Sequence, residues 1–232
     1  MILYCLPFAG GSARFYSDWE LLHIQAEPLE LPGRGARADE RPLDNVLDLV
    51  AATTDCLRQH RPFWLFGHSL GALLAYELAH EAMASRSGDL RGIIVSGHNA
   101  PHLPIRPLGV TSAWSDSQVV EALRAFGGTE DELIADEAFT EFVAPILRAD
   151  LMAGDNYRFR SRPRLQVPVL VLGGLSDSET DLAGLNAWRE HTTARTTVRL
   201  FPGGHFFLND RRDECLSAID EVIRSADRAT TV

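Results

Sequence analysis

Cysteine is scarce in this chain of 232 residues, and its three copies, Cys5, Cys56 and Cys215, are scattered. No two of them form a CxxC pair or a zinc-like spacing, so the sequence predicts no disulfide framework, no metal site and a reducing compartment. Cys5 lies in an apolar run and is expected to be a small core residue rather than a nucleophile. We expect no cofactor.

Positive charge is also in deficit, because 22 lysines and arginines face 32 aspartates and glutamates, for a net charge of −10. Nucleic acid is therefore not an expected partner, since its recognition needs a basic surface. No apolar run approaches the roughly 20 residues of a membrane span, and the start of the chain lacks the charged segment and cleavage site of a secretory leader. We expect a cytoplasmic protein with no membrane partner, and a monomer as the working state.

What the chain does have is an alternation of short apolar runs with helical stretches, which is typical of a mostly parallel sheet flanked by crossover helices. Strands are predicted near residues 2–6, 24–31, 63–67, 91–97, 167–172 and 196–201. Helices are predicted over residues 12–20, 43–60, 70–85, 182–193 and 209–227. Residues 1–232 are read as one α/β domain.

Residues 101–165 interrupt this alternation. They contain no convincing strand but three helical segments, around 116–126, 130–135 and 137–152. So long an excursion is unusual for a plain connection between two strands, and it predicts an inserted helical lid.

The strongest chemical signal is the GxSxG sequence Gly67-His68-Ser69-Leu70-Gly71. It follows a predicted strand and opens a predicted helix, which is the strand–turn–helix context of a nucleophile elbow in the α/β-hydrolase fold. Glycines at its two ends remove side chains that would clash in so sharp a turn. Ser69 is therefore the predicted nucleophile, with a serine cap in a glycine-rich turn as the structural alternative.

A serine hydroxyl needs a general base, and His205 is the predicted one. It follows the last predicted strand on a glycine-rich loop, in the chain order Ser–acid–His of this fold. His98 and His102 could line the pocket. The other histidines are assigned to the elbow, to solvated surface or to a helix end: His68, His23, His60, His80 and His191.

The acid is expected after the strand that ends at Leu172. Asp177 is the first choice because it lies nearest the strand end with room for the turn, and Asp181, an alternative helix cap, is the second. The oxyanion hole is predicted from the backbone N–H of Leu70 and one from the loop after the first strand. Phe8 is the first choice of that second donor and Ala9 the next.

Several segments, in this order, resemble the type II thioesterases that accompany polyketide and nonribosomal peptide synthetases. They are LPFAGGS at 6–12, LPGRG at 31–35, FGHSLGA at 66–72, SG at 96–97, AP at 100–101, LRAD at 147–150 and GGHFFL at 203–208. The resemblance covers nearly the whole chain and supports Asp177 as the acid. Ser178 stands where many relatives have proline, and the chain begins without the polar leader that many relatives carry.

This resemblance implies a serine thioesterase that removes acyl or aminoacyl groups from the phosphopantetheine arm of an acyl or peptidyl carrier protein, usually to clear stalled synthetases. Three alternatives stay open: a carboxylesterase or lipase acting on small free esters, an acyltransferase, and an inactive partner that docks to a synthetase.

Several positions in the lid have two interpretations. Its apolar side chains either line an acyl channel or pack the lid together: Leu123, Phe126, Phe139, Phe142, Val143 and Leu147. Arg148 and Asp150 match a family motif or form a structural ion pair. Four alternating arginines could contact a carrier protein or form a solvated edge: Arg158, Arg160, Arg162 and Arg164.

Overall fold

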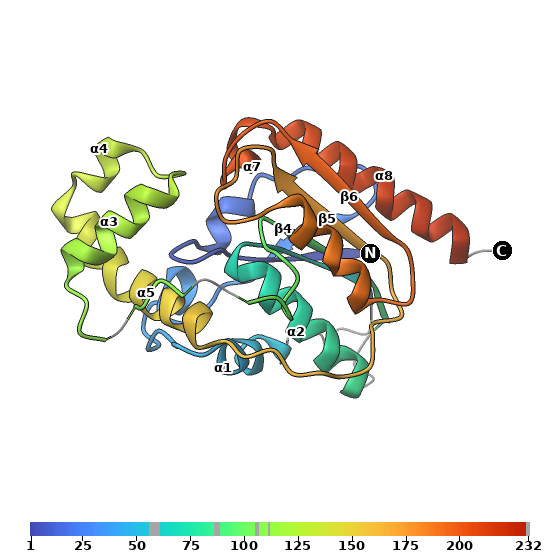
Figure 1. Ribbon diagram of the computed structural model, residues 1–232, viewed down its shortest axis with the longest axis horizontal. Coiled ribbons are helices and arrows are strands. Elements are labelled where there is room, and N and C mark those ends of the chain that lie inside the picture. The colour runs from blue at the N-terminus through green and yellow to red at the C-terminus, as the bar shows by residue number, and fades with distance from the viewer. Residues whose placement is uncertain (56–60, 86–88, 105–106, 111, 231–232) are drawn as a thin grey trace.

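The computed structural model describes residues 1–55, 61–85, 89–104, 107–110 and 112–230. Its strands form one parallel sheet in the order β2-β1-β3-β4-β5-β6, with helices on both faces (Figure 1). The strands are β1 (Ile2–Leu6), β2 (Gln25–Pro28), β3 (Pro62–His68), β4 (Asp89–Ser96), β5 (Val169–Gly174) and β6 (Thr196–Phe201). The predicted α/β class is confirmed.

The helices lie beside the sheet or in the segment between β4 and β5. They are α1 (Val46–Ala51), α2 (Leu70–Ser85), α3 (Asp116–Phe126), α4 (Asp131–Ile134), α5 (Glu137–Asn156), α6 (Leu182–Asn186), α7 (Phe207–Asp210) and α8 (Arg212–Thr230). Helices α1 and α2 lie on one face of the sheet, and α8 lies on the other (Figure 1). None of the helices in the described part of the chain is both long and apolar enough to cross a membrane.

Both faces of the central strands are buried, which explains their nearly continuous apolar sequences. In β1, Ile2, Tyr4 and Leu6 pack in the cluster that includes α1 and α2. Leu3 and Cys5 point the other way, into the cluster that includes α8. Cys5 is thus a core residue, as expected, whereas Cys56 lies outside the described residues.

Three predicted helices are shorter or interrupted. Residues 12–20 form only the 3₁₀ turn η1 (Ala13–Tyr16), after which Trp19 packs on Phe66 with ring centroids 4.8 Å apart. Within the predicted helix 43–60, α1 covers Val46–Ala51 and is capped by Asn45, and residues 56–60 lie outside the described part. Residues 182–193 divide into α6 and the 3₁₀ turn η4 (Ala187–His191). Asn45 and Asp181 cap the starts of α1 and α6, which the apolar period alone does not locate.

The segment between β4 and β5 forms α3, α4 and α5, with no strand among its described residues. A capping box at Ser115 and Gln118 starts α3, and the Asp136 side chain caps α5. Near the end of α5, the Asp155 carboxylate accepts the backbone N–H groups of Leu108 and Val110 at 2.9 Å. The two ends of the insertion are therefore joined. Its role as a lid stays a prediction.

A buried polar cluster ties the segment after α5 to α2. Glu77 of α2 accepts a hydrogen bond from the Tyr157 hydroxyl at 2.6 Å and pairs with Arg162. The Arg162 guanidinium also lies over the Tyr76 ring, 5.5 Å from its centroid. Arg162 is thus engaged within the fold, and the interpretation of the four arginines as one docking row stays a prediction.

Three histidines differ from expectation because they join this cluster. His80 is buried rather than solvated, and His191, expected as a cation at a helix end, is buried, which lowers its pKa to about 4. The Tyr76 hydroxyl lies 3.0 Å from His191 Nδ1, and His191 Nε2 lies 2.7 Å from His102 Nδ1. His102 therefore contacts His191, and it is not among the described residues that line the candidate pocket. A sequence cannot show which rings meet across the fold.

The burial of His80 makes stability depend on pH. Burial lowers the pKa of His80 to about 4, and the positive Arg162 nearby adds to this shift. In the unfolded chain, histidine has a pKa near 6.5. Between about pH 6.5 and 4, His80 is therefore protonated in the unfolded state but neutral in the folded state. The free energy of unfolding should therefore fall as the pH drops through this window.

We predict that His80→Phe will lose less stability than the wild type between about pH 7 and 5. Phenylalanine keeps the ring contact with Tyr76, and His80 Nε2 has no hydrogen-bond partner to lose. Urea unfolding at several pH values measures the effect, with exposed His23→Gln as the control that keeps the wild-type slope. Equal slopes for His80→Phe and wild type would contradict this assignment.

Candidate active site

The sharp turn at Ser69 joins β3 to α2. Ser69 has a φ of 54°, and it is the one non-glycine residue of the described chain in the left-handed region. A Cβ atom at Gly67 would collide with the Gly71 backbone, and one at Gly71 with the Leu6 carbonyl. The two glycines are therefore needed for this turn, which presents Ser69 at the carboxyl edge of the sheet.

His205 and Asp177 meet at the same edge. His205 Nδ1 lies 3.1 Å from both carboxylate oxygens of Asp177. Their two loops are tied together, because the Ser176 N–H donates to the Gly203 carbonyl at 2.9 Å. Asp181, the second choice for the acid, instead caps α6 by accepting the Gly184 N–H at 2.7 Å. The structure thus brings Asp177, and not Asp181, to His205.

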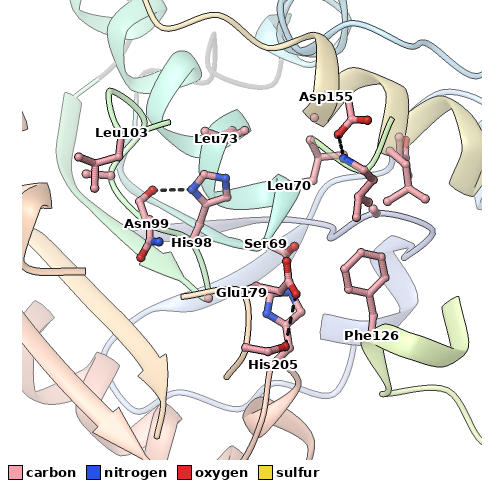
Figure 2. A pocket seen from close by; sticks show the side chains of 18 of the residues that line it. Ser69, Leu70, Leu73, His98, Asn99, Leu103, Phe126, Asp155, Glu179 and His205 are labelled. Carbon is pink, nitrogen blue, oxygen red and sulfur yellow. Dashed lines mark hydrogen bonds between the residues drawn. The ribbon is translucent and has the colours of Figure 1, made fainter. Parts of the chain in front are cut away.

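Hydrogen bonds keep Asp177 ionised. Burial raises the pKa of this carboxyl, but the hydrogen bond from His205, together with those from the Glu179 N–H and the Thr180 hydroxyl, outweighs burial and leaves the pKa below its usual value. The charged carboxylate favours a proton on His205 Nδ1, which leaves Nε2 as the basic atom. Ser69 lies beside His205 in the pocket (Figure 2).

His68 supports the His205 ring from the side of the sheet, a role that the sequence did not suggest. The two ring centroids are 4.9 Å apart, and His68 Nδ1 lies 2.9 Å from the Ser96 hydroxyl. Burial holds the pKa of His68 well below its usual value, so its ring is neutral. Gly97, with a φ of 60°, leaves room for both rings.

Ser69, Gly97 and His205 line a pocket of about 260 Å³ (Figure 2). Its apolar lining includes Ala9, Leu70, Leu73, Leu103, Phe126 and Leu151, and its polar lining includes His98, Asn99 and Glu179. The expectation that His98 could line the pocket is thus confirmed. His98 Nδ1 donates to the Asn99 carbonyl at 2.5 Å, and burial lowers its pKa, so its neutral ring offers Nε2 as an acceptor.

The two predicted oxyanion donors differ in their surroundings. Leu70 lines the pocket, as does Ala9, but Phe8 is not among the described residues that do. The Phe8 ring packs instead against Phe15 and Phe206, at centroid distances of 5.0 and 4.9 Å. Its carbonyl accepts the Gly11 N–H at 2.9 Å and closes a turn. Which backbone N–H of this loop serves as the donor stays a prediction.

The apolar side chains of the insertion serve different purposes. Leu123, Val143 and Leu147 are buried in the cluster that joins its helices. Phe126 lines the pocket, with its ring centroid 6.1 Å from that of His205. Phe139 packs at the edge of the cluster, and Phe142 is 55% exposed. Packing within the insertion is therefore confirmed for Leu123, Val143 and Leu147, whereas an acyl channel lined by Phe126 stays a prediction.

Arg148 and Asp150 do not pair with each other. Arg148 pairs with Asp116 at the start of α3, whereas Asp150 pairs with Arg34, which is 116 positions earlier in the chain. Residues 148 and 150 point to different sides of α5, because two steps along a helix turn through about 200°. The described residues contain no group of three or more ligating side chains that could hold a metal ion.

Comparison with known proteins places this geometry in a family. The model of the thioesterase domain matches residues 1–223. Thioesterase PikA5 of Streptomyces venezuelae is 34% identical over 99% of this chain and 84% of its own length. RedJ, a thioesterase from the prodiginine biosynthetic pathway of Streptomyces coelicolor, is 35% identical, with a TM-score of 0.87 over 95% of this chain and 89% of its own. BorB, the type II thioesterase of the borrelidin cluster, is 36% identical, with a TM-score of 0.83 over 95% and 91%.

We predict that Gly67→Ala will destabilise the protein by about 3 kcal/mol or more, because the new Cβ meets backbone that cannot move aside. Thermal or urea unfolding gives the change. Gly154→Ala in α5 is the matched control, since a Cβ there meets nothing within 4 Å. That control should be neutral or gain about 0.5–1 kcal/mol. Equal stability of the two variants would contradict the steric account of the elbow.

Proposed function

This chain belongs to the thioesterase family, and we propose that it uses Ser69, His205 and Asp177 to release acyl or aminoacyl groups from the phosphopantetheine arm of a carrier protein. The observation that carries the proposal is the contact of His205 Nδ1 with Asp177 at 3.1 Å, in a pocket that Ser69 also lines. A nucleophile, a base and a group that orients the base are the three parts that acyl transfer through serine requires.

In the first step, His205 Nε2 takes the Ser69 proton as Oγ attacks the thioester carbonyl carbon. The carbonyl oxygen becomes an oxyanion, which the backbone N–H of Leu70 and one from the loop 6–12 stabilise. Each such donor contributes about 3–4 kcal/mol in other enzymes. The positive end of α2, which begins at Leu70, favours the same charge. The tetrahedral intermediate then collapses, the C–S bond breaks, and His205 returns its proton to the departing thiolate.

In the second step, His205 takes a proton from water, and the resulting hydroxide attacks the acyl-Ser69 ester. Collapse of this second intermediate releases the free acid and returns the proton to Ser69. Asp177 remains charged throughout and holds the imidazole in one orientation. Its lowered pKa suits this role, because the carboxylate does not compete for the proton.

The substrate class rests on the relatives. RedJ and BorB are thioesterases of biosynthetic pathways or clusters, and BorB is a type II thioesterase. Editing of stalled polyketide or nonribosomal peptide synthetases is therefore the proposed task. A cytoplasmic setting is part of the proposal, since Cys5 and Cys215 are free thiols.

The first test is hydrolysis of acetyl- or propionyl-phosphopantetheinyl carrier protein, followed by intact-mass spectrometry. Wild type should remove the acyl mass and Ser69→Ala should not, because the nucleophile is gone. Release of the free acid separates hydrolysis from acyl transfer. Cleavage of small oxyesters without cleavage of the thioester would contradict the proposed substrate and favour the carboxylesterase alternative.

A second test distinguishes the two candidate acids. Asp177→Asn should lower kcat by about 10⁴-fold, because an amide there favours the unproductive tautomer of His205. Asp181→Asn is the matched control, since Asp181 caps α6 and makes no contact with His205. Steady-state kinetics on acyl-pantetheine thioesters provides the measurement. A large loss in Asp181→Asn, or a small one in Asp177→Asn, would overturn the assignment.

A further inference from the structure

The most deeply buried ion pair at the site joins two segments that are far apart in the chain. Asp150 of α5 is 0% exposed and Arg34 is 2% exposed. Arg34 Nη1 donates to Asp150 Oδ2 at 2.6 Å, and Nη2 donates to Oδ1 at 2.8 Å. The contact is thus the two-pronged form that fixes both distance and orientation.

The same two side chains hold the loop that follows β1. The Gly10 N–H donates to Asp150 Oδ2 at 2.8 Å, and Arg34 Nη1 donates to the Gly11 carbonyl at 3.0 Å. Asp150 therefore binds Gly10, and Arg34 binds the next residue, Gly11. Gly10 has a φ of 74°, and a Cβ there would approach Leu147 of α5 to 3.2 Å.

Apolar packing could not replace this arrangement. The turn directs a backbone N–H and a backbone carbonyl into the interior, and each would lose a hydrogen bond if it faced only apolar side chains. A carboxylate alone would be costly to bury, and so would a guanidinium alone, whereas together they satisfy the turn and each other. Burial of the two charged groups costs desolvation energy, and in return their hydrogen bonds hold the loop in a single conformation.

Asp150 also lines the pocket, beside Ala9 and Ser69. Its two oxygens are already engaged by Arg34 and Gly10, so neither is available as a second base. The carboxylate is part of the wall of the site without acting on the substrate.

We infer that Arg34 and Asp150 are positioning residues for the reaction, which hold the loop 6–12 so that its backbone N–H group points at the developing oxyanion. This inference rests on the proposed function, because it assumes that this loop supplies an oxyanion donor. Preorganised donors matter most in the transition state, so their displacement affects kcat more than substrate binding. The pair also binds α5 to this loop, so the insertion and the oxyanion donor share one support.

The main test is Asp150→Asn, which keeps an oxygen that can accept the Gly10 N–H but removes the charge that holds Arg34. We expect kcat for an acyl-pantetheine thioester to fall by about 10–100-fold, with KM changed by less than about threefold. Asp116→Asn, which removes the partner of Arg148 in the exposed ion pair of the same insertion, is the matched control. Its kcat should stay within about twofold of wild type.

A second readout separates positioning from a general structural role. Addition of Ser69 Oγ to an alkylboronic acid gives a tetrahedral anion at boron, with the serine proton passing to His205, so its affinity reports the oxyanion hole. The uncleavable amide analogue of the thioester reports ground-state binding. In Asp150→Asn the affinity for the boronic acid should fall in parallel with kcat/KM, while the affinity for the amide analogue stays at the wild-type value. Equal weakening of both ligands, or an unchanged kcat, would overturn the inference.

Arg34→Lys keeps the inference testable if Asp150→Asn does not fold. Lysine retains the charge but lacks the planar fork that bridges Asp150 and the Gly11 carbonyl. We therefore expect a smaller loss of kcat than in Asp150→Asn, with weaker binding of the boronic acid and unchanged binding of the amide analogue. The assays are repeated with p-nitrophenyl acetate, whose hydrolysis needs the same oxyanion hole. Loss with this oxyester supports positioning even if the wild type does not cleave thioesters, so the two proposals fail separately.

Discussion

Ser69 has a left-handed backbone conformation that serine seldom adopts. The elements around it hold it in that conformation. A left-handed residue costs on the order of 1–3 kcal/mol, which only a rigid surrounding can hold. Here β3 lies in the middle of the sheet, α2 is buried on nearly every side, and Gly67 and Gly71 allow the two to approach. The Ser69 N–H is also fixed by the Ser96 carbonyl at 2.8 Å. The strain is therefore maintained by the core of the protein and not by the site itself.

The buried ionisable groups of the site differ in their charge. Asp177 has enough hydrogen-bond donors to remain charged despite its burial. For His68 and His98 burial is the larger effect, and it lowers the pKa of each and leaves both rings neutral, even though His98 donates to the Asn99 carbonyl. His205 thus lies next to the negative charge of Asp177 and two uncharged rings. This arrangement favours a single histidine as the base, because no second imidazole nearby holds a competing proton.

The insertion is attached to the domain by polar contacts at α5 and by apolar contacts elsewhere. Asp150 reaches Arg34 and the loop after β1, and Tyr157, just past the end of α5, reaches Glu77 of α2. Helices α3 and α4 instead pack on α5 through an apolar cluster, and they extend away from the sheet (Figure 1). Polar contacts have directional requirements that apolar ones lack, so they fix the register of α5 on the domain. Phe126, at the end of α3, reaches the pocket from a helix that the apolar cluster and the Arg148–Asp116 ion pair join to α5.

By itself the sequence determined the class of fold and the identity of the elbow, because apolar period and the GxSxG pattern are local and depend on neighbours within a few residues. It also ranked Asp177 above Asp181 from its distance to a strand end. Only the tertiary structure decided that Asp150 pairs with Arg34 and not with Arg148, and that the His68 ring lies next to that of His205. It also decided that His80 and His191 contact Tyr76 and that His102 contacts His191. These contacts join residues from different elements, and such meetings depend on how the helices and strands pack in three dimensions, which no local pattern contains.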